Sequence, residues 1–265
     1  MILDLNFNRN KIKIYLERHT DFSAFYQVFV EKTYPNLISK INKGDIVIDA
    51  GANIGMFSIM ASILVGKTGK VIAIEPEPEN LKILKRNVEL NNINNMIIIN
   101  KALFSKSGER INFIQNGVMS KISLSDNNEP GNYIEVETIT LDDIISCLNM
   151  QPKVLKMDIE GAEKFALLSS QKTFQTINYF EGEIHSLEDY NVLLRYSNLF
   201  IFKQEPIESM RKVLNFSFKH PLKIFNLEFH NKFSTTKRIL FSRIKKDQPA
   251  NFPIIVYGER LLVKN

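Results

Sequence analysis

A short glycine turn between an apolar strand and an apolar helix constrains this chain more than any other feature. Ile46-Val47-Ile48 predicts a buried strand, the turn Asp49-Ala50-Gly51-Ala52-Asn53-Ile54-Gly55 follows it, and an apolar helical run comes next. Glycines in such a turn let a ligand approach the backbone, and the turn's N–H groups and the helix dipole are expected to point at that ligand. We therefore expect a nucleotide-type site above the turn.

A second acid supports this site. Val71-Ile72-Ala73-Ile74 predicts the next strand and ends at Glu75, twenty positions after Gly55. The first two strands of an open α/β sheet end side by side, so Glu75 can accept both hydroxyls of a ribose lying across the turn. Asn53 stands where the dinucleotide fingerprint has its middle glycine, and no third glycine follows. Asparagine tolerates positive φ, so the turn survives, but a ligand without phosphates fits it better than a pyrophosphate.

Length and composition bound the fold. The 265 residues, 44% of them hydrophobic, suffice for one large α/β domain with insertions and are cramped for two. One cysteine, Cys147, excludes an internal disulfide, and the first residues lack the uninterrupted apolar core of a secretion signal. The longest apolar run, Met56 to Val65, is too short to cross a bilayer. We expect a cytoplasmic protein without a transmembrane anchor.

The order of the elements follows from hydrophobic periodicity. Alternating strand and helix patterns predict a parallel sheet with helices on both faces. The predicted strands are 45–49, 70–75, 96–100, 154–157, 178–184, 254–257 and 261–263, the predicted helices include 54–65 and 78–91, and 109–115 and 133–139 form an antiparallel excursion. Aromatic side chains at helical spacing over 12–42 predict a helical leader. We expect this leader, as a cap, to occupy residues 1–43 and the sheet domain to occupy 44–265.

The net charge of +5 is concentrated late in the chain. Between Pro206 and Lys246 ten Lys and Arg residues stand against only Glu208 and Glu228. The basic, phenylalanine-rich insertion at about 206–248 is predicted to attract an anionic or lipid-linked substrate or a membrane surface, which would make the protein peripheral to the membrane; a solvated basic face is the equal alternative. Four apolar side chains recur there at helical spacing behind Pro221: Leu222, Phe225, Phe229 and Phe233. They predict an amphipathic helix that either packs on the sheet or docks on such a partner.

The glycine turn, Glu75 with Pro76, and the later stretch Asp158-Ile159-Glu160-Gly161-Ala162-Glu163 occur together in this chain. This combination resembles the FkbM-type family of S-adenosylmethionine-dependent methyltransferases, over about residues 30 to 187. The resemblance implies a class I methyltransferase fold, a Rossmann-like, seven-stranded, mostly parallel sheet with an antiparallel last strand. It also implies S-adenosylmethionine as the cofactor, a ligand that has a ribose and an amino-acid end but no phosphates.

The resemblance assigns roles to particular residues. The turn would face the methionine part of the cofactor and Glu75 would hold the ribose, while Ala102 and Leu103 either line the adenine or only pack in the core. The cofactor-binding residues implied in this way are Asp49, Gly51, Ala52, Asn53, Gly55, Glu75, Pro76, Ala102 and Leu103.

Acids and a histidine follow the fourth and fifth predicted strands, where open α/β sheets place their active crevice. They are Asp158, Glu160, Glu163, Glu183 and His185. Such groups bind a divalent cation, supply a general base for a substrate hydroxyl, or only cap helix starts. The catalytic candidates are Asp158, Glu160 and His185, with Asp158 facing the methyl donor or acceptor and His185 as a candidate base; Glu163 is expected to be a helix cap. The metal requirement stays open.

Missing motifs narrow the acceptor. An Asn/Asp-Pro-Pro-aromatic stretch, typical of methylases acting on amide or base nitrogens, does not follow the fourth strand, and Cys147 precedes that strand instead of following it. A nucleic acid is therefore not the expected acceptor, and we expect O-methylation of a sugar, glycan or other natural-product hydroxyl. Two alternatives remain: an NAD-dependent oxidoreductase on a Rossmann fold, which Asn53 opposes, and a non-catalytic protein that binds RNA or an anionic membrane through the basic insertion.

Overall fold

The computed structural model describes residues 1–31, 33–115, 121–122, 132–206 and 254–261. Most of the basic insertion lies outside the described residues, and so does the amphipathic helix predicted behind Pro221. None of the helices in the described part of the chain combines the length and the apolar character that a bilayer crossing requires.

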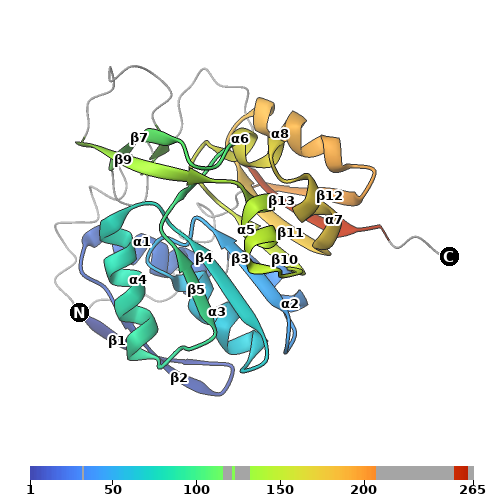
Figure 1. The fold of residues 1–265 in the computed structure, drawn as a ribbon. Coiled ribbons are helices and arrows are strands. Elements are labelled where there is room, and N and C mark those ends of the chain that lie inside the picture. Colours follow the sequence, from blue (N-terminus) through green and yellow to red (C-terminus); the bar gives the residue numbers. More distant parts are fainter. Residues whose placement is uncertain (32, 116–120, 123–131, 207–253, 262–265) are drawn as a thin grey trace.

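A mixed sheet forms the centre of the described structure (Figure 1). Within the described residues it has seven strands, in the spatial order β12 (Phe200–Pro206), β13 (Ile254–Arg260), β11 (Tyr179–Ile184), β10 (Val154–Met157), β3 (Ile46–Ala50), β4 (Lys70–Ile74) and β5 (Met96–Ile99). Parallel pairing joins β11, β10, β3, β4 and β5, whereas β13 runs antiparallel to both of its neighbours. The predicted mostly parallel sheet with an antiparallel strand is confirmed.

Helices cover both faces of this sheet because its strands are apolar on both sides. Ile48 and Ile72 belong to the core under one layer of helices, and Val47 and Val71 belong to the core under the other layer. The helices are α1 (His19–Phe25), the π-helix η1 (Tyr26–Glu31), α2 (Pro35–Lys40), α3 (Met56–Val65), α4 (Pro78–Leu90), α5 (Leu141–Leu148), α6 (Glu163–Leu168), α7 (Gln171–Thr176), α8 (Leu187–Leu193) and the 3-10 turn η3 (Leu194–Tyr196).

The N-terminal segment is not helical throughout, which corrects the prediction for its first part. Residues 2–15 form an antiparallel hairpin of β1 (Ile2–Phe7) and β2 (Asn10–Tyr15). Lys11 to Tyr15 alternate polar and apolar side chains, and Ile12 and Ile14 are buried on one face of the strand. Asn87 of α4 and Asn91, the residue that caps the end of this helix, exchange hydrogen bonds with the β2 backbone and hold the hairpin there. Helices begin only at His19.

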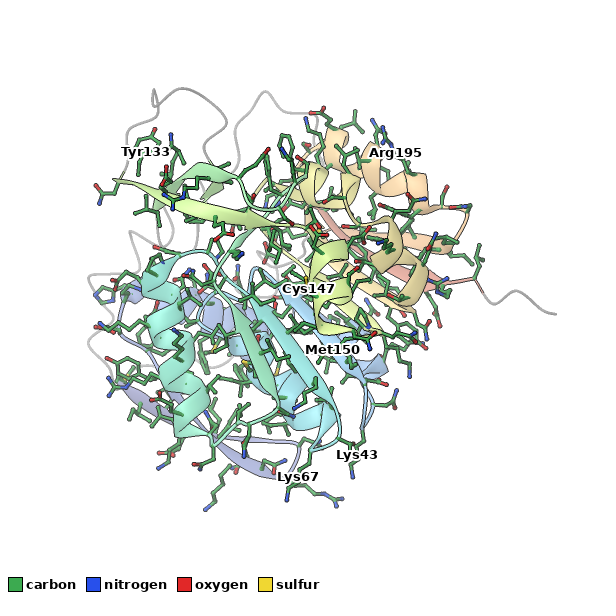
Figure 2. All side chains as sticks on the ribbon, viewed as in Figure 1. Lys43, Lys67, Tyr133, Cys147, Met150 and Arg195 are labelled. Atoms are coloured by element: carbon green, nitrogen blue, oxygen red, sulfur yellow. The ribbon has the colours of Figure 1, made fainter. Side chains whose placement is uncertain are left out.

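The antiparallel excursion is confirmed, and it lies toward the carboxyl ends of the central strands. It contains β7 (Arg110–Gln115), β8 (Lys121–Ile122) and β9 (Asn132–Ile139), and β6 (Ala102–Leu103) pairs in parallel with β9. In Figure 2, Lys43 and Lys67, shortly before β3 and β4, lie at the bottom, whereas Tyr133 at the start of β9 lies at the top. The end of the sheet nearer the excursion is therefore the one at which the predicted site residues emerge.

The last strands differ from the expected pattern in one respect. The strand β12 was not predicted, because Gln204, Glu205 and Pro206 interrupt its apolar alternation after Phe202. The expected strand at 254–257 is present and extends to Arg260, but 262–263 lie outside the described residues. The boundary between a leader at 1–43 and a domain at 44–265 stays a prediction.

Candidate active site

The turn after β3 has the backbone conformation that its sequence predicts. Gly51, Asn53 and Gly55 all have left-handed φ values, of 77°, 51° and 89°. Asparagine therefore keeps the turn closed where a second glycine was missing. At Gly51 no side chain fits at all, since a Cβ would lie 1.8 Å from the carbonyl oxygen of Asp158. The turn after β3 and the loop after β10 thus touch through their backbones.

The N–H groups of the turn do not point at a ligand, and this expectation was wrong. Those of Gly51 and Ala52 donate to the Ile74 carbonyl, that of Asn53 donates to Glu75 Oε2 at 2.7 Å, and those of Ile54 and Gly55 donate within the turn. The turn closes on itself and on the end of β4, so acceptors in the turn, on Ile74 and on Glu75 take up every donor from 51 to 55. A ligand at the turn is therefore recognised by side chains, and glycine lets it come close to the backbone.

A buried ion pair supports the turn from below. Lys156 Nζ lies 3.2 Å from Asp49 Oδ1 and donates to the Gly51 carbonyl at 2.8 Å, and Ser58 Oγ donates to Asp49 Oδ2 at 2.5 Å. Burial raises the pKa of the Asp49 carboxyl, and the charge of Lys156 opposes that rise. Burial lowers the pKa of Lys156, but Asp49 and Asp158 raise it above its usual value, so this lysine keeps its charge. Lys156 is a site residue that sequence reasoning missed, although it stands beside the Asp158 motif.

Glu75 lies against the turn, where a ribose acceptor is required. Its carboxylate accepts from the Asn53 and Glu77 backbone N–H groups and from Asn80 Nδ2, at 2.7, 3.0 and 3.1 Å. A carboxylate has about four acceptor positions, so one remains for a ligand hydroxyl. Burial raises the pKa of Glu75 to about 7, although the three donors favour its ionised form. The residues present therefore fit the ribose of S-adenosylmethionine.

Asp158 meets a tyrosine from the N-terminal segment. The Tyr34 hydroxyl donates to Asp158 Oδ2 at 2.9 Å, and Tyr34 is only 3% exposed. Burial, together with the charges of Asp158 and Glu183, raises the pKa of Tyr34 well above its usual value, so its proton stays in place. Asp158 Oδ1 is buried and accepts no hydrogen bond from the described residues. Sequence patterns gave Tyr34 only a packing role, because its partner is 124 positions away.

His185 lies at the end of β11 among the predicted acids. Its Nδ1 is 3.1 Å from Glu163 Oε1, and its Nε2 is 3.5 Å from Glu160 Oε2 and 3.7 Å from Glu183 Oε1. Burial lowers the pKa of His185, but the three carboxylates, led by Glu163, outweigh it and raise this pKa to about 10. The structure thus brings Asp158, Glu160 and His185 into one cluster.

Glu160 and Glu163, in the loop after β10 and at the start of α6, have different roles. Glu163 is fully buried and accepts from the Ile159 and Gly161 N–H groups, which precede α6, so it closes the loop and holds His185 instead of capping its own helix. Glu160 has a left-handed φ of 54°, an uncommon conformation for a non-glycine residue that is typical of functional sites. The Glu160 side chain is 24% exposed and is the more open of the two.

The remaining predicted residues lie beside this centre. Pro76 borders a cavity of about 370 Å³ that Asn100 also lines, next to Glu75. Ala102 and Leu103 are buried in β6, and Leu103 packs in the largest core cluster. Packing accounts for both residues, and a role for them at the adenine stays a prediction.

The strand order, the two touching loops and the acid after β4 define a class I S-adenosylmethionine-dependent methyltransferase. Residues 49–219 match the model of the FkbM methyltransferase domain, so the chain belongs to the FkbM methyltransferase family. S-adenosylmethionine is its cofactor, and the nicotinamide alternative is set aside. Membership of a methyltransferase family also favours turnover over binding alone.

Two curated relatives and one solved structure show the range of this similarity. The chain is 30% identical over 134 residues, 47% of its length and 67% of the relative's, to a protein of Saccharolobus solfataricus described as a cobalt-precorrin-6B C(15)-methyltransferase. It is 26% identical over 151 residues, 57% of its length and 60% of the relative's, to the hexuronic acid methyltransferase AglP of Haloferax volcanii. A protein of Clostridium thermocellum described as an rRNA methylase shares the fold, with TM-score 0.51 and 10% identity over 88% of this chain and 96% of that one.

Proposed function

We propose that this protein transfers the methyl group of S-adenosylmethionine to a hydroxyl of a sugar, glycan or other natural product. The observation that carries the proposal is the cluster of Asp158, Glu160 and His185 directly beside the glycine turn. A neutral hydroxyl is a weaker nucleophile than an amine and reacts faster when a base removes its proton, and this crevice has carboxylates that take one. The hexuronic acid methyltransferase of Haloferax volcanii acts on a sugar acid, which supports an acceptor of this class.

The cofactor supplies a methyl group already activated on a sulfonium sulfur. The acceptor oxygen bonds to that methyl carbon, the carbon–sulfur bond breaks with its electron pair left on sulfur, and the hydroxyl proton goes to a carboxylate. Positioning therefore matters more than chemical assistance. Glu75 and the turn fix the donor side, and Asp158, which touches Gly51 through its backbone, lies at the junction of donor and acceptor.

Glu160 is the residue to which we assign the proton. It is the most exposed of the three acids that surround His185, with 24% of its side chain accessible against 10% for Glu183 and none for Glu163. His185 is held between carboxylates at both ring nitrogens, so it orients them.

The test is a product analysis with ¹³C-methyl-labelled cofactor and a panel of hexuronic acids, neutral sugars and amines. Methyl groups bonded to oxygen, nitrogen and carbon have separate ¹³C chemical shifts. Labelled O-methyl product from a hydroxyl acceptor supports the proposal, and label only on carbon or nitrogen refutes it. The name of the Saccharolobus solfataricus relative, a C(15)-methyltransferase, makes carbon the second candidate for this assay.

The basic insertion at about 206–248 is proposed to bring an anionic or lipid-linked acceptor, or a membrane surface, to this crevice. The ten Lys and Arg residues between Pro206 and Lys246 support this role.

A further inference from the structure

Three potential metal ligands converge at the ends of β10 and β11. Asp158, Glu183 and His185 each offer one ligand atom, and these atoms all lie within 4.8 Å of one another. Asp158 Oδ1 and His185 Nε2 are buried, and neither forms a hydrogen bond to the described residues. A buried polar atom left without a hydrogen bond destabilises the fold, so the arrangement is incomplete as it stands.

The atoms that face away from this centre are already held. Glu163 is a carboxylate and accepts, so His185 Nδ1 donates to it, and Nε2 is the ring nitrogen that lies 3.7 Å from Glu183 Oε1. Tyr34 in turn donates to Asp158 Oδ2, and Oδ1 is the carboxylate oxygen that is buried without a hydrogen bond to the described residues. A carboxylate behind a histidine and a donor behind a carboxylate are the supports that metal sites use to orient their ligands.

We propose that Asp158, Glu183 and His185 bind a divalent cation whose remaining positions take two oxygens on adjacent carbons of the acceptor. Two carboxylates and one imidazole suit Mn²⁺ or Mg²⁺, which keep open positions for substrate oxygens. This inference rests on the proposed hydroxyl methylation and adds a class of substrate to it: a vicinal diol, or a carboxylate with a neighbouring hydroxyl. A hydroxyl on the cation gives up its proton more readily, and Glu160 lies beside His185 to take it.

Charge balance favours a cation at this place. Asp158, Glu160, Glu163 and Glu183 gather around a single histidine, and Lys156, whose charge also acts on Asp158, is already paired with Asp49. Repulsion among carboxylates this close is relieved by a cation. If the proton on His185 alone relieves this repulsion, no metal will bind. The experiment must therefore distinguish a protonated His185 from one that binds a cation.

The experiment is a titration of the metal-depleted full-length protein with Mn²⁺, without cofactor or acceptor, followed by calorimetry and electron paramagnetic resonance. We expect saturable binding of one ion per chain and a ¹⁴N coupling from a coordinated imidazole. His185→Gln removes that coupling, and Asp158→Asn and Glu183→Gln abolish binding. Glu163→Gln, behind the histidine, weakens binding by about 10- to 100-fold. Glu188→Gln is the matched control: it removes a carboxylate that is 70% exposed and pairs with Lys164, and binding should be unchanged.

Two results overturn the cation site: no saturable Mn²⁺ binding by a wild-type protein that still binds S-adenosylhomocysteine, or equal binding by wild type and all three ligand variants. Circular dichroism of each variant excludes a loss of fold as the cause. Failure of this inference is distinguishable from failure of the proposed function. Methylation of a hydroxyl in the presence of a chelator refutes the cation site and leaves O-methylation standing, whereas Mn²⁺ bound with imidazole coupling confirms the site whichever acceptor is found.

Discussion

The carbonyl oxygen of Asp158 occupies the space that any side chain on Gly51 would need, 1.8 Å from the position of a Cβ. The loops after β3 and β10 can meet only because this residue is glycine. Their contact aligns the cofactor side of the crevice with the side that carries the acids.

Gly51→Ala is expected to destabilise the protein and to abolish cofactor binding, because the new methyl pushes the two loops apart. Left-handed strain alone accounts for about 1–2 kcal/mol. Gly108→Ala is the control, since Gly108 has a φ of 79° and an added Cβ there meets nothing within 4 Å. Chemical denaturation and S-adenosylhomocysteine titration of both variants provide the measurement. Equal loss of stability in the two would show that the contact with Asp158 has no role.

Glu75→Ala is expected to weaken binding of S-adenosylmethionine by roughly 1.5–3 kcal/mol, because a ribose hydroxyl loses a charged acceptor. The same change also removes the hydrogen bond that the backbone N–H of Asn53 donates to Glu75. Calorimetric titration gives the affinity, and Glu79→Ala, a change of another acid at the start of α4, is the control. Unchanged affinity in a folded variant would remove Glu75 from the cofactor site.

Cofactor affinity is expected to rise with pH, because burial raises the pKa of Glu75 to about 7 and only the ionised carboxylate is the strong acceptor. Apparent affinity follows the ionised fraction, so binding should be about tenfold weaker one unit below this pKa than well above it. Titrations with S-adenosylhomocysteine on both sides of neutrality test this. Glu75→Gln separates the effect from ionisation of the ligand, and a pH dependence that survives in this variant contradicts the assignment.

Stability of the unliganded protein changes with pH in the opposite direction. A carboxyl whose folded pKa is raised contributes its full stability below its unfolded pKa, near 4.5, and loses it as the pH rises through about 7. The loss amounts to roughly 3 kcal/mol for such a shift. The difference in free energy of unfolding between Glu75→Gln and wild type should therefore shift in favour of the variant as the pH rises from about 4.5 to about 7.

Asp158→Asn and His185→Ala are expected to leave cofactor affinity nearly intact while lowering turnover at least about 100-fold, since we propose that both face the acceptor. Affinity comes from titration with S-adenosylhomocysteine and turnover from the product assay once an acceptor is found. Losses of equal size in affinity and rate would place these residues on the cofactor side instead.

Vesicle binding tests the basic insertion. We expect sedimentation with anionic vesicles that weakens at high salt, since each lysine near a charged membrane surface contributes about 1 kcal/mol. Replacing Lys237, Arg238, Lys245 and Lys246 with Gln should remove this binding, and neutral vesicles are the control. Binding that depends neither on salt nor on these residues would leave the segment without a membrane role.

Local patterns along the chain predicted the parts of the fold that local physics determines. Strand β3, the turn and α3 follow from apolar runs and glycine positions, and Glu75 and Asp158 follow from strand ends. The hairpin was missed because the helical spacing of the later aromatic residues was extended back over Ile12 and Ile14, whose alternation is that of a strand. Pairings across long separations in the sequence, such as Tyr34 with Asp158, leave no local signal.

The prediction that the N–H groups of the turn point at a ligand was wrong for a different reason. Sequence spacing correctly indicated that Glu75 lies near Asn53, but not that its carboxylate takes the backbone N–H expected to serve a ligand. Likewise the motif around Asp158 was recognised, whereas the position of Lys156 beneath Gly51 depends on the register in which β10 pairs with β3. Chemistry at a strand end can be read along the chain, but the direction of each hydrogen bond depends on three-dimensional contact.

The contact between the Tyr34 hydroxyl and Asp158 bears on when the site forms during folding. Helix α2 docks in the same region, where Glu181 of β11 accepts from the Leu37 backbone N–H at 2.8 Å. Contacts between residues this distant in sequence carry a large loop-closure entropy and tend to form late. A nascent chain can complete β3 and β4 well before β10 and β11 exist to receive α2. We therefore expect the loop that carries Asp158 to gain its contact with Tyr34 only after β3 and β4 have formed, and a chain folded only that far has no cluster of Asp158 and His185 to expose.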